Sequence, residues 1–176
     1  MRAKFVFDAS PLIHLTKAGL SCLIADLEGE KYTVPLVVRE VIKRGKELDY
    51  PDAAITESLI VEGLLRVKVP QKVDTIIRLH KDIHPGESEV IALAKEIDAI
   101  AFIDDRVARA VAKIQGVHIE GSYGVILRAA ARGSMSKEDA EATLGALVNS
   151  GWRCDAELYA ALLMSLKSLV ENRQSK

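Results

Sequence analysis

The sequence predicts a three-layer α/β/α protein with a central, mainly parallel sheet of about five strands and a C-terminal helical hairpin. Two observations support this fold class. Short apolar runs alternate with segments of helical periodicity, which is the pattern of crossover units in a parallel sheet. After Gly133 the alternation stops, because two helical segments follow each other with no strand between them.

The predicted strands are the short apolar runs themselves. They cover residues 4–7, 32–34, 65–69, 101–103 and 117–120. Helices are predicted over residues 51–60, 72–82, 87–97, 105–115 and 122–132. The helix that begins at Pro35 is the best marked, since proline suits a first helical position and apolar residues recur at helical spacing up to Gly45.

Residues 134–176 are predicted to form a helical extension packed on the α/β domain of residues 1–133. The two helices of this extension cover residues 136–149 and 155–172, and leucine-rich stripes give each an apolar face. Because the extension is apolar and short, we expect the protein to form a homodimer.

The composition is that of a globular protein inside the cell. The chain has 176 residues, of which 49% are hydrophobic and 28% charged, enough for one substantial core. No apolar stretch approaches the ~18 residues that span a bilayer, so we expect no membrane association and a cytoplasmic location. Cys22 and Cys154 are isolated, which argues against a disulfide framework or a zinc ribbon.

The net charge gives little sign of a nucleic-acid-binding protein. It is -1 at pH 7, whereas such proteins usually carry a basic excess, and the aromatic content of 5% argues against a platform of exposed rings for base stacking. Binding to a polyanion would therefore depend on local basic patches or a bridging metal. Two groups of basic residues at helical spacing are candidates for such patches, although basic strips of this kind are usually ordinary solvated surface. They are Arg39, Lys43 and Lys46, and Arg106, Arg109 and Lys113.

Acidic residues far apart in the chain stand where strand ends or helix starts would bring them together. Asp8 ends the first predicted strand and Asp104 the fourth, and in an open parallel sheet ligands bind beyond these carboxyl ends. Glu87 opens a helix whose positions three, four and seven further on are apolar, so we expect it on the buried face. Glu40 stands at the margin of the apolar stripe of its helix.

Taken singly, each acid has a plainer interpretation. Asp8, Asp104 and Asp105 stand at helix starts, where a carboxylate can cap the helix. Glu87 in a first turn is favoured by helix electrostatics, and Glu40 lies among basic residues, as solvated surface acids do. Each added member makes coincidence a weaker explanation.

Carboxylates gathered in one place repel one another unless a cation lies between them, so together these acids predict a divalent-metal site. Mg²⁺ and Mn²⁺ prefer oxygen ligands, and Mg²⁺ usually keeps several waters. A metal-activated water can attack a phosphodiester while the metal offsets charge in the transition state. The residues therefore predict a nuclease. A zinc site at His80 and His84 is the weaker interpretation, because Pro85 and Gly86 break the helical pattern directly afterwards.

Four stretches together resemble the PIN domain, the fold named after the N-terminus of the pilus-twitching protein. They are residues 5–13 (FVFDASPLI), 34–41 (VPLVVREV), 86–94 (GESEVIALA) and 102–109 (FIDDRVAR). Residues 121–127 (GSYGVIL) and the end containing Gly151-Trp152-Arg153 are similar to a prokaryotic branch of PIN-like proteins. The stretches are short, but their order and spacing are fairly specific and they cover nearly the whole chain.

The resemblance implies a metal-dependent endoribonuclease, often the toxin of a VapC-like toxin–antitoxin pair. The implied cofactor is Mg²⁺ or Mn²⁺, and the implied partners are RNA and an antitoxin protein. Carried over by position, the metal-binding, catalytic acids are Asp8, Glu40, Glu87 and Asp104, with Asp105 as an auxiliary ligand and Ser10 and Ser122 as supporting residues.

Alternatives remain open both for the site residues and for the function. Many family members have Asp where Glu87 stands, so Glu89 is a second candidate there, as Asp105 is beside Asp104. The alternative function is a non-catalytic module that binds nucleic acid or protein. A third is a phosphatase-like hydrolase of small phosphoesters, which would share the metal chemistry and ignore RNA.

Overall fold

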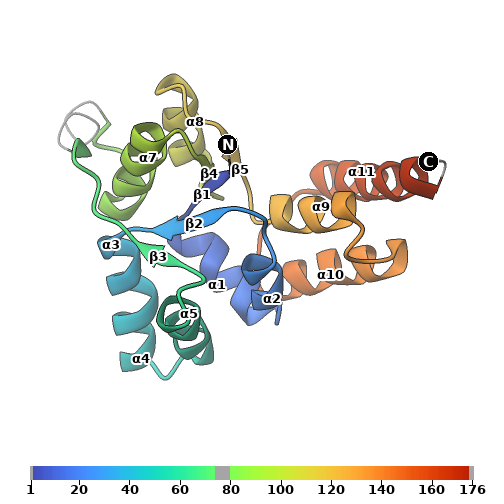
Figure 1. Ribbon diagram of the computed structural model, residues 1–176, viewed down its shortest axis with the longest axis horizontal. Helices are drawn as coiled ribbons and strands as arrows, with labels where there is room; N and C mark the ends of the chain where they lie inside the picture. The colour runs from blue at the N-terminus through green and yellow to red at the C-terminus, as the bar shows by residue number, and fades with distance from the viewer. Residues whose placement is uncertain (1, 74–79, 175–176) are drawn as a thin grey trace.

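The computed structural model describes residues 2–73 and 80–174, and it shows the predicted three layers (Figure 1). Within these residues, five parallel strands form one sheet in the order β3-β2-β1-β4-β5. The strands are β1 Lys4–Phe7, β2 Glu30–Thr33, β3 Arg66–Val67, β4 Ile100–Phe102 and β5 Ile119–Glu120. The predicted fold class is therefore confirmed.

The strand ends shift from the predicted ones because pairing with the central strand sets the register. Lys4 pairs with Glu30 and Phe5 with Ile100, so β2 and β4 both begin earlier than predicted. The outer strands β3 and β5 are two residues long, shorter than predicted. Each lies at an edge of the sheet and has only one neighbour with which to pair.

Most of the predicted helices are confirmed. The helical segments are α1 Ala9–Lys17, α2 Ser21–Ala25, α3 Pro35–Val38, η1 Arg39–Arg44, α4 Gly45–Glu47, α5 Pro51–Val61, α7 Pro85–Ile97, α8 Arg106–Ile114, α9 Tyr123–Arg132, α10 Lys137–Asn149 and α11 Ala156–Gln174. The short helix α2 was not predicted. The helix predicted over residues 72–82 lies largely outside the described residues, because these leave out residues 74–79.

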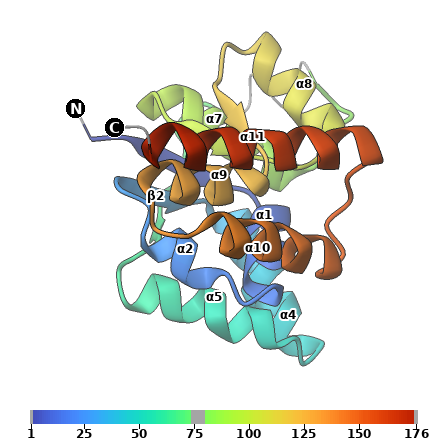
Figure 2. The ribbon, with the colours of Figure 1, turned by 90° about the vertical axis from the view of Figure 1, so that its right-hand side faces the viewer.

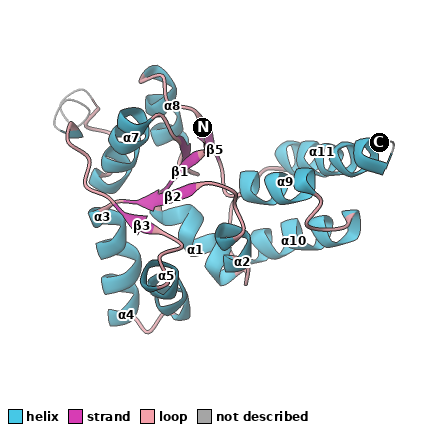
Figure 3. Cartoon of the chain, in the orientation of Figure 1, coloured by secondary structure: helices cyan, strands magenta, loops and turns pink. Residues whose placement is uncertain are grey.

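The helices cover both faces of the sheet, as right-handed crossovers between parallel strands require. Helices α7 and α8 lie on one side of the strands, and α1, α2 and the segment from α3 to α5 lie on the other (Figures 1 and 3). From the central strand β1, the chain builds β2 and β3 toward one edge and β4 and β5 toward the other. The strand order therefore reverses between β1 and β4, which is where open α/β sheets bind their ligands.

The core around this reversal point is aromatic. The ring of Phe102 on β4 stacks on Phe7 with 4.7 Å between centroids and lies 5.8 Å from Phe5. All three side chains are buried, and aromatic pairs of this kind add to the free energy gained from burial alone. This packing holds the carboxyl ends of β1 and β4 side by side.

The helix that begins at Pro35 differs from the prediction in its middle. Residues Arg39–Arg44 form a π-helical turn between the α-helical segments α3 and α4. Such turns are rare and recur at functional sites. The π-helical turn carries Glu40 and the basic residues around it, so the irregular backbone coincides with the predicted acid.

Gly45 lets this helix cross α5 at close range, and its replacement should destabilise the fold. A Cβ atom at Gly45 would lie 2.8 Å from the Cβ of Ala53, a methyl group that cannot rotate away. The Gly45→Ala protein should lose about 1–2 kcal/mol of unfolding free energy in urea titrations, although alanine favours helices. The matched control is Gly145→Ala, because a Cβ there meets nothing within 4 Å. Equal effects of both substitutions would contradict this account.

The helical extension packs on helix α9. Figure 2 shows α11 running across α9, with α10 beside them, and Leu144, Leu147, Leu162 and Leu166 belong to the same buried cluster as the α/β core. Trp152 is buried beside the ring of Tyr123, with 5.8 Å between centroids. No helix in the described part of the chain is both long and apolar enough to cross a membrane.

Candidate active site

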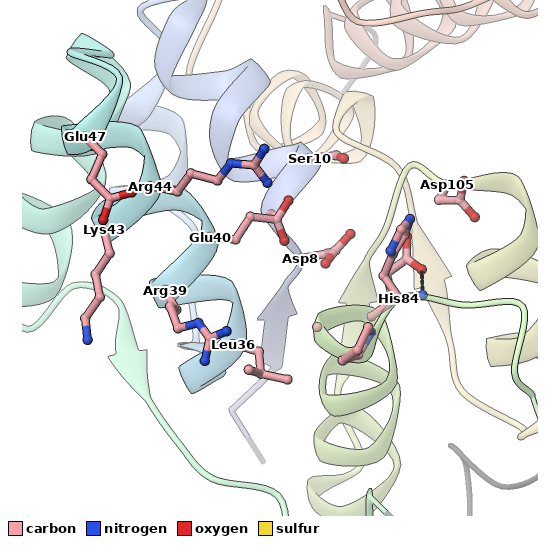
Figure 4. Close-up of a pocket in the computed structure, with 14 residues that line it drawn as sticks. Asp8, Ser10, Leu36, Arg39, Glu40, Lys43, Arg44, Glu47, His84 and Asp105 are labelled. Carbon is pink, nitrogen blue, oxygen red and sulfur yellow. Dashed lines mark hydrogen bonds between the residues drawn. The ribbon is translucent and has the colours of Figure 1, made fainter.

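An open cleft lies at the carboxyl ends of the central strands, between the π-helical turn η1 and the start of α7 (Figure 4). Its volume is about 830 Å³. The acidic residues that line it are Asp8, Glu40, Glu47, Glu87 and Asp105, and the basic ones are Arg39, Lys43 and Arg44. The end of β1, the helical segment from α3 to α4, the first turn of α7 and the start of α8 thus contribute side chains to one place.

Asp8 is the central and most buried of these acids. Its backbone N–H donates to the carbonyl of Phe102 at 3.1 Å, which joins β1 to β4 at this point. Burial raises the pKa of Asp8 to about 8; the N–H of Ala9 partly opposes this, and the charges of Glu87, Glu40 and Asp104 raise it further. Asp8 therefore experiences three other carboxylates at once.

Glu40 and Glu87 approach Asp8 from opposite walls of the cleft. Glu40 is exposed on η1, and its Oε2 would lie 3.9 Å from a Cβ at Gly86, so it extends toward the start of α7. Glu87 is only 8% exposed. Its Oε2 accepts a hydrogen bond from the backbone N–H of His84 at 2.9 Å. Burial raises the pKa of Glu87, which this hydrogen bond partly offsets.

The structure separates Glu87 from Glu89, the alternative left open by the sequence. The carboxylate of Glu89 accepts a hydrogen bond from the backbone N–H of Leu36 at 3.1 Å. It therefore ties the start of α3 to α7 and does not line the cleft. Of the two acids, Glu87 is the one that the fold brings to Asp8.

Asp104 and Asp105 are oriented differently. The carboxylate of Asp104 accepts hydrogen bonds from the backbone N–H of Ser122 at 2.8 Å and from the Ser122 hydroxyl. Asp105 caps α8, where one oxygen accepts from Val107 and Ala108 at 2.8 Å each, and it also lines the cleft. The capping interpretation of Asp105 is confirmed. The charge of Asp104 raises the pKa of Asp8, although Asp104 does not line the cleft.

Of the two predicted supporting serines and the two basic patches, some residues line the cleft and others have partners elsewhere. Ser10 lines the cleft, and Ser122 is buried against Asp104. Arg39 and Lys43 line the cleft, but the third predicted member of that patch, Lys46, instead pairs with Glu57 at 2.6 Å. In the second patch, the guanidinium of Arg109 donates to the carbonyl of Ile103 at 2.9 Å.

Several lining residues were not predicted, and one signal would have found most of them. Arg44 and Glu47 line the cleft together with Leu36, Arg39, Glu40 and Lys43, and these six positions follow one another at steps of three and one. That is the spacing of a single helix face. His84 also lines the cleft, whereas His80 lies beside Gln115, 3.4 Å from its amide nitrogen, so the two histidines do not form a zinc pair.

His14 is a further neighbour that the sequence did not suggest. Its ring lies within 3.3 Å of the Ser150 hydroxyl, between α10 and α11. Burial lowers the pKa of His14, and the charge of Asp104 partly offsets that shift. The helical extension therefore contacts a side chain on which the charge of Asp104 acts.

The donor set suits a hard divalent cation. Within the described ranges, no three His, Cys, Asp or Glu side chains stand close enough as arranged to coordinate an ion together. The acids around Asp8 nevertheless offer only oxygen ligands, which Mg²⁺ and Mn²⁺ prefer. None of the ion pairs in the described part of the chain neutralises Asp8, Glu40, Glu87 or Asp104. The mutual repulsion of these acids can be offset by a proton on Asp8, whose pKa is raised, or by a bound cation.

The fold and the cleft define a class: three-layer α/β/α proteins with an acidic site at the reversal point of a parallel sheet. A family model described as a PIN domain matches residues 4–168, and the chain belongs to this family. PIN domains are generally nucleases that bind nucleic acids and typically use divalent metals.

A solved structure supports the fold. The crystal structure of PAE2754 from Pyrobaculum aerophilum superposes with a TM-score of 0.51 and 16% sequence identity, covering 74% of this chain and 99% of that one. No curated protein matches the chain.

Proposed function

We propose that the protein is a metal-dependent endoribonuclease that hydrolyses RNA phosphodiesters with Mg²⁺ or Mn²⁺ in the acidic cleft. The observation that carries the proposal is Asp8: it is buried at the end of the central strand, its pKa is raised to about 8, and three other carboxylates contribute to that shift. Perturbed carboxylates in a cleft are typical of catalytic sites. Membership of the PIN domain family supports the same conclusion.

In this proposal Asp8, Glu40, Glu87 and Asp104 hold the ion, with Asp105 as an auxiliary ligand. When bound, the ion supplies an acidified water and offsets charge on the reacting phosphate. The protein's own part is to orient the ligands. Ser122 fixes Asp104 through two hydrogen bonds, and the His84 amide fixes Glu87.

RNA cleavage in the presence of each metal tests the proposal. Purified protein and labelled single-stranded RNA are incubated with Mg²⁺, Mn²⁺ or a chelator, and the products are separated by length. We expect internal cuts with either metal and intact RNA with the chelator. Intact RNA with both metals would contradict the proposal, and hydrolysis of an aryl phosphate without RNA cleavage would favour a phosphatase-like hydrolase.

The basic residues of the cleft are proposed to hold RNA phosphates. Arg39 and Lys43 project from the same helix face as Glu40. We expect the double substitution Arg39→Gln and Lys43→Gln to weaken RNA binding and to reduce the slope of log affinity against log salt by roughly 1 to 2, because each phosphate contact releases about one counterion. Lys46→Gln is the control, since Lys46 pairs with Glu57. An unchanged slope in the double variant would remove the proposed contacts.

Ser122 is proposed to act by positioning Asp104. Its hydroxyl donates to one carboxylate oxygen and its N–H to the other. The Ser122→Ala protein should bind Mn²⁺ about 10–100-fold more weakly in calorimetric titrations, as is typical for the loss of a partner that orients a ligand. Ser134→Ala at an exposed site is the control. Unaltered Mn²⁺ affinity would show that Asp104 does not need this hydroxyl.

The finer parts of the proposal concern partners. The protein is proposed to be the toxin of a VapC-like pair, with an antitoxin protein as its inhibitor. It is also proposed to form a homodimer through the helical extension of residues 134–176, on which Met164 is 74% exposed. Expression should arrest growth, and co-expression of the adjacent reading frame should relieve it. A monomer by light scattering over a wide concentration range would remove the dimer.

A further inference from the structure

A second, smaller pocket adjoins the acidic cleft and shares Glu40 and Arg44 with it. Its volume is about 220 Å³, below the 300–1,000 Å³ typical of sites for drug-sized ligands. The pocket lies among α1, the π-helical turn and the start of α5, and its further polar or aromatic lining residues are Lys17, Tyr50 and Asp52. It is therefore a compartment for one small group beside the proposed reaction site.

Asp52 gives this pocket a buried acceptor without a partner. The residue is only 3% exposed, and none of the described residues donates a hydrogen bond to its Oδ1. The nearby hydroxyl of Thr56 donates to the backbone carbonyl of Asp52 and not to its carboxylate. A buried carboxylate oxygen without a donor is unfavourable. Oδ1 itself is closed to solvent, so a donor in the pocket would be bound well once the carboxylate rotates about its soft χ2 torsion toward it.

The remaining walls of the pocket suit an aromatic ring with phosphate groups next to it. Tyr50 and Leu48 line the pocket and are 47% and 50% exposed, unusually accessible for large apolar side chains. The ammonium of Lys17 lies 5.1 Å from the centre of the Tyr50 ring. Lys17 and Arg44 are exposed cations at this pocket. A stacking surface, a buried acceptor and two cations thus occur together.

We propose that this pocket binds one base of the RNA substrate, namely a base with an exocyclic amino group, next to the phosphodiester held in the acidic cleft. The inference rests on the proposed function. The amino N–H donates to Asp52, and the ring stacks on Tyr50 in place of the Lys17 ammonium that lies over it in the free protein. Lys17, once displaced, and Arg44 contact the adjoining phosphates. Uracil is disfavoured, because the two carbonyls that flank its N–H would face the carboxylate.

A protein partner's arginine is the competing occupant, since a guanidinium also pairs with a buried carboxylate. The charges at the pocket favour the base. Lys17 and Arg44, which offset the charges of Glu40 and Asp52 at this pocket, would repel an incoming guanidinium, whereas they attract the phosphates on either side of a nucleotide.

Binding of short RNAs tests the base preference separately from cleavage. Fluorescence anisotropy with labelled hexamers of cytidine and of uridine is measured in the presence of a chelator. We expect the unmodified protein to bind the cytidine hexamer about tenfold more tightly, the effect of one hydrogen bond to a charged group. In the Asp52→Asn protein the preference should fall below about twofold, because an amide can accept from cytosine or donate to uracil.

Two further variants keep the test decisive. Asp49→Asn makes the same charge change at an exposed site three residues away, where the positive φ of 54° suits asparagine, and it should retain the preference. Tyr50→Ala should weaken binding of both hexamers about fivefold or more, whereas Tyr50→Phe should not. Thermal unfolding confirms that each variant is folded.

Defined outcomes overturn the inference. Equal affinity of the unmodified protein for both hexamers, or a preference that survives Asp52→Asn, removes the base pocket. Asp52-dependent binding of a short arginine peptide, without a base preference, reassigns the pocket to a protein partner. Cleavage of RNA without any base preference leaves the proposed function intact and sinks only the pocket, whereas a base preference without cleavage supports the pocket and contradicts the nuclease.

Discussion

The Asp8→Asn protein is expected to cleave RNA about a thousandfold more slowly than the unmodified protein with Mg²⁺ or Mn²⁺. Asp8 lies at the centre of the acidic site, and the charges of Glu87, Glu40 and Asp104 all act on it. Removing its charge removes the ligand around which the others are arranged, and the loss of several kcal/mol of transition-state stabilisation corresponds to this factor. Cleavage rates at saturating metal, together with calorimetric titration of Mn²⁺, measure the effect.

The substitution should leave the fold intact, which makes its effect on activity interpretable. Asparagine has nearly the same shape, and it removes a carboxylate that is buried at an energetic cost. Asp82→Asn, at an exposed position, is the matched control and should retain full activity. Equal cleavage by the Asp8→Asn protein and the unmodified protein would exclude Asp8 from catalysis.

The metal-free protein is expected to become less stable by several kcal/mol as the pH rises from about 4 to about 8. The pKa of Asp8 is about 8 in the folded protein, against about 3.9 in an unfolded chain. Between these values the folded state holds a proton that the unfolded state has released, so rising pH favours unfolding. The stability is complete below the lower pKa and is lost as pH passes through the upper one. The raised pKa of Glu87 acts in the same direction.

A divalent cation should reverse this loss. Mn²⁺ binds ionised carboxylates, so it should raise the melting temperature strongly near pH 8 and little near pH 5. In the Asp8→Asn protein, both the decline with pH and the stabilisation by Mn²⁺ should be much smaller. Chemical unfolding at several pH values, with chelator or with Mn²⁺, measures both effects. Identical pH profiles for the variant and the unmodified protein would show that Asp8 is not the group responsible.

The parts of the site that lie next to regular elements could be predicted from the sequence. Asp8 follows β1 and Asp104 follows β4, and parallel strands that neighbour each other end at the same edge. The position of Glu87 followed from the apolar residues at helical spacing after it. In these cases a short-range pattern is enough, because the side-chain direction depends only on local backbone geometry.

The choices among neighbouring residues could not be predicted, because long-range contacts make them. Glu89 is withdrawn from the cleft by the backbone N–H of Leu36, 53 residues away. Lys46 is withdrawn by Glu57 on α5, while Arg44 lines the cleft from the π-helical turn. No local pattern indicates which partner a polar side chain will meet across the fold.

The sequence by itself determined the parallel α/β layers, the strand ends that carry acids and the family resemblance, since these depend on periodicity and residue order. Only the tertiary structure decided which acids lie close enough to act on the pKa of Asp8 and where the second pocket lies. It also decided that the Oδ1 atom of Asp52 is buried without a donor. An acid in the first turn of a helix such as α5 is ordinarily solvated. Asp52 is buried next to Ala53, where α5 crosses α4 closely at Gly45, and that crossing exists only when the whole chain is packed.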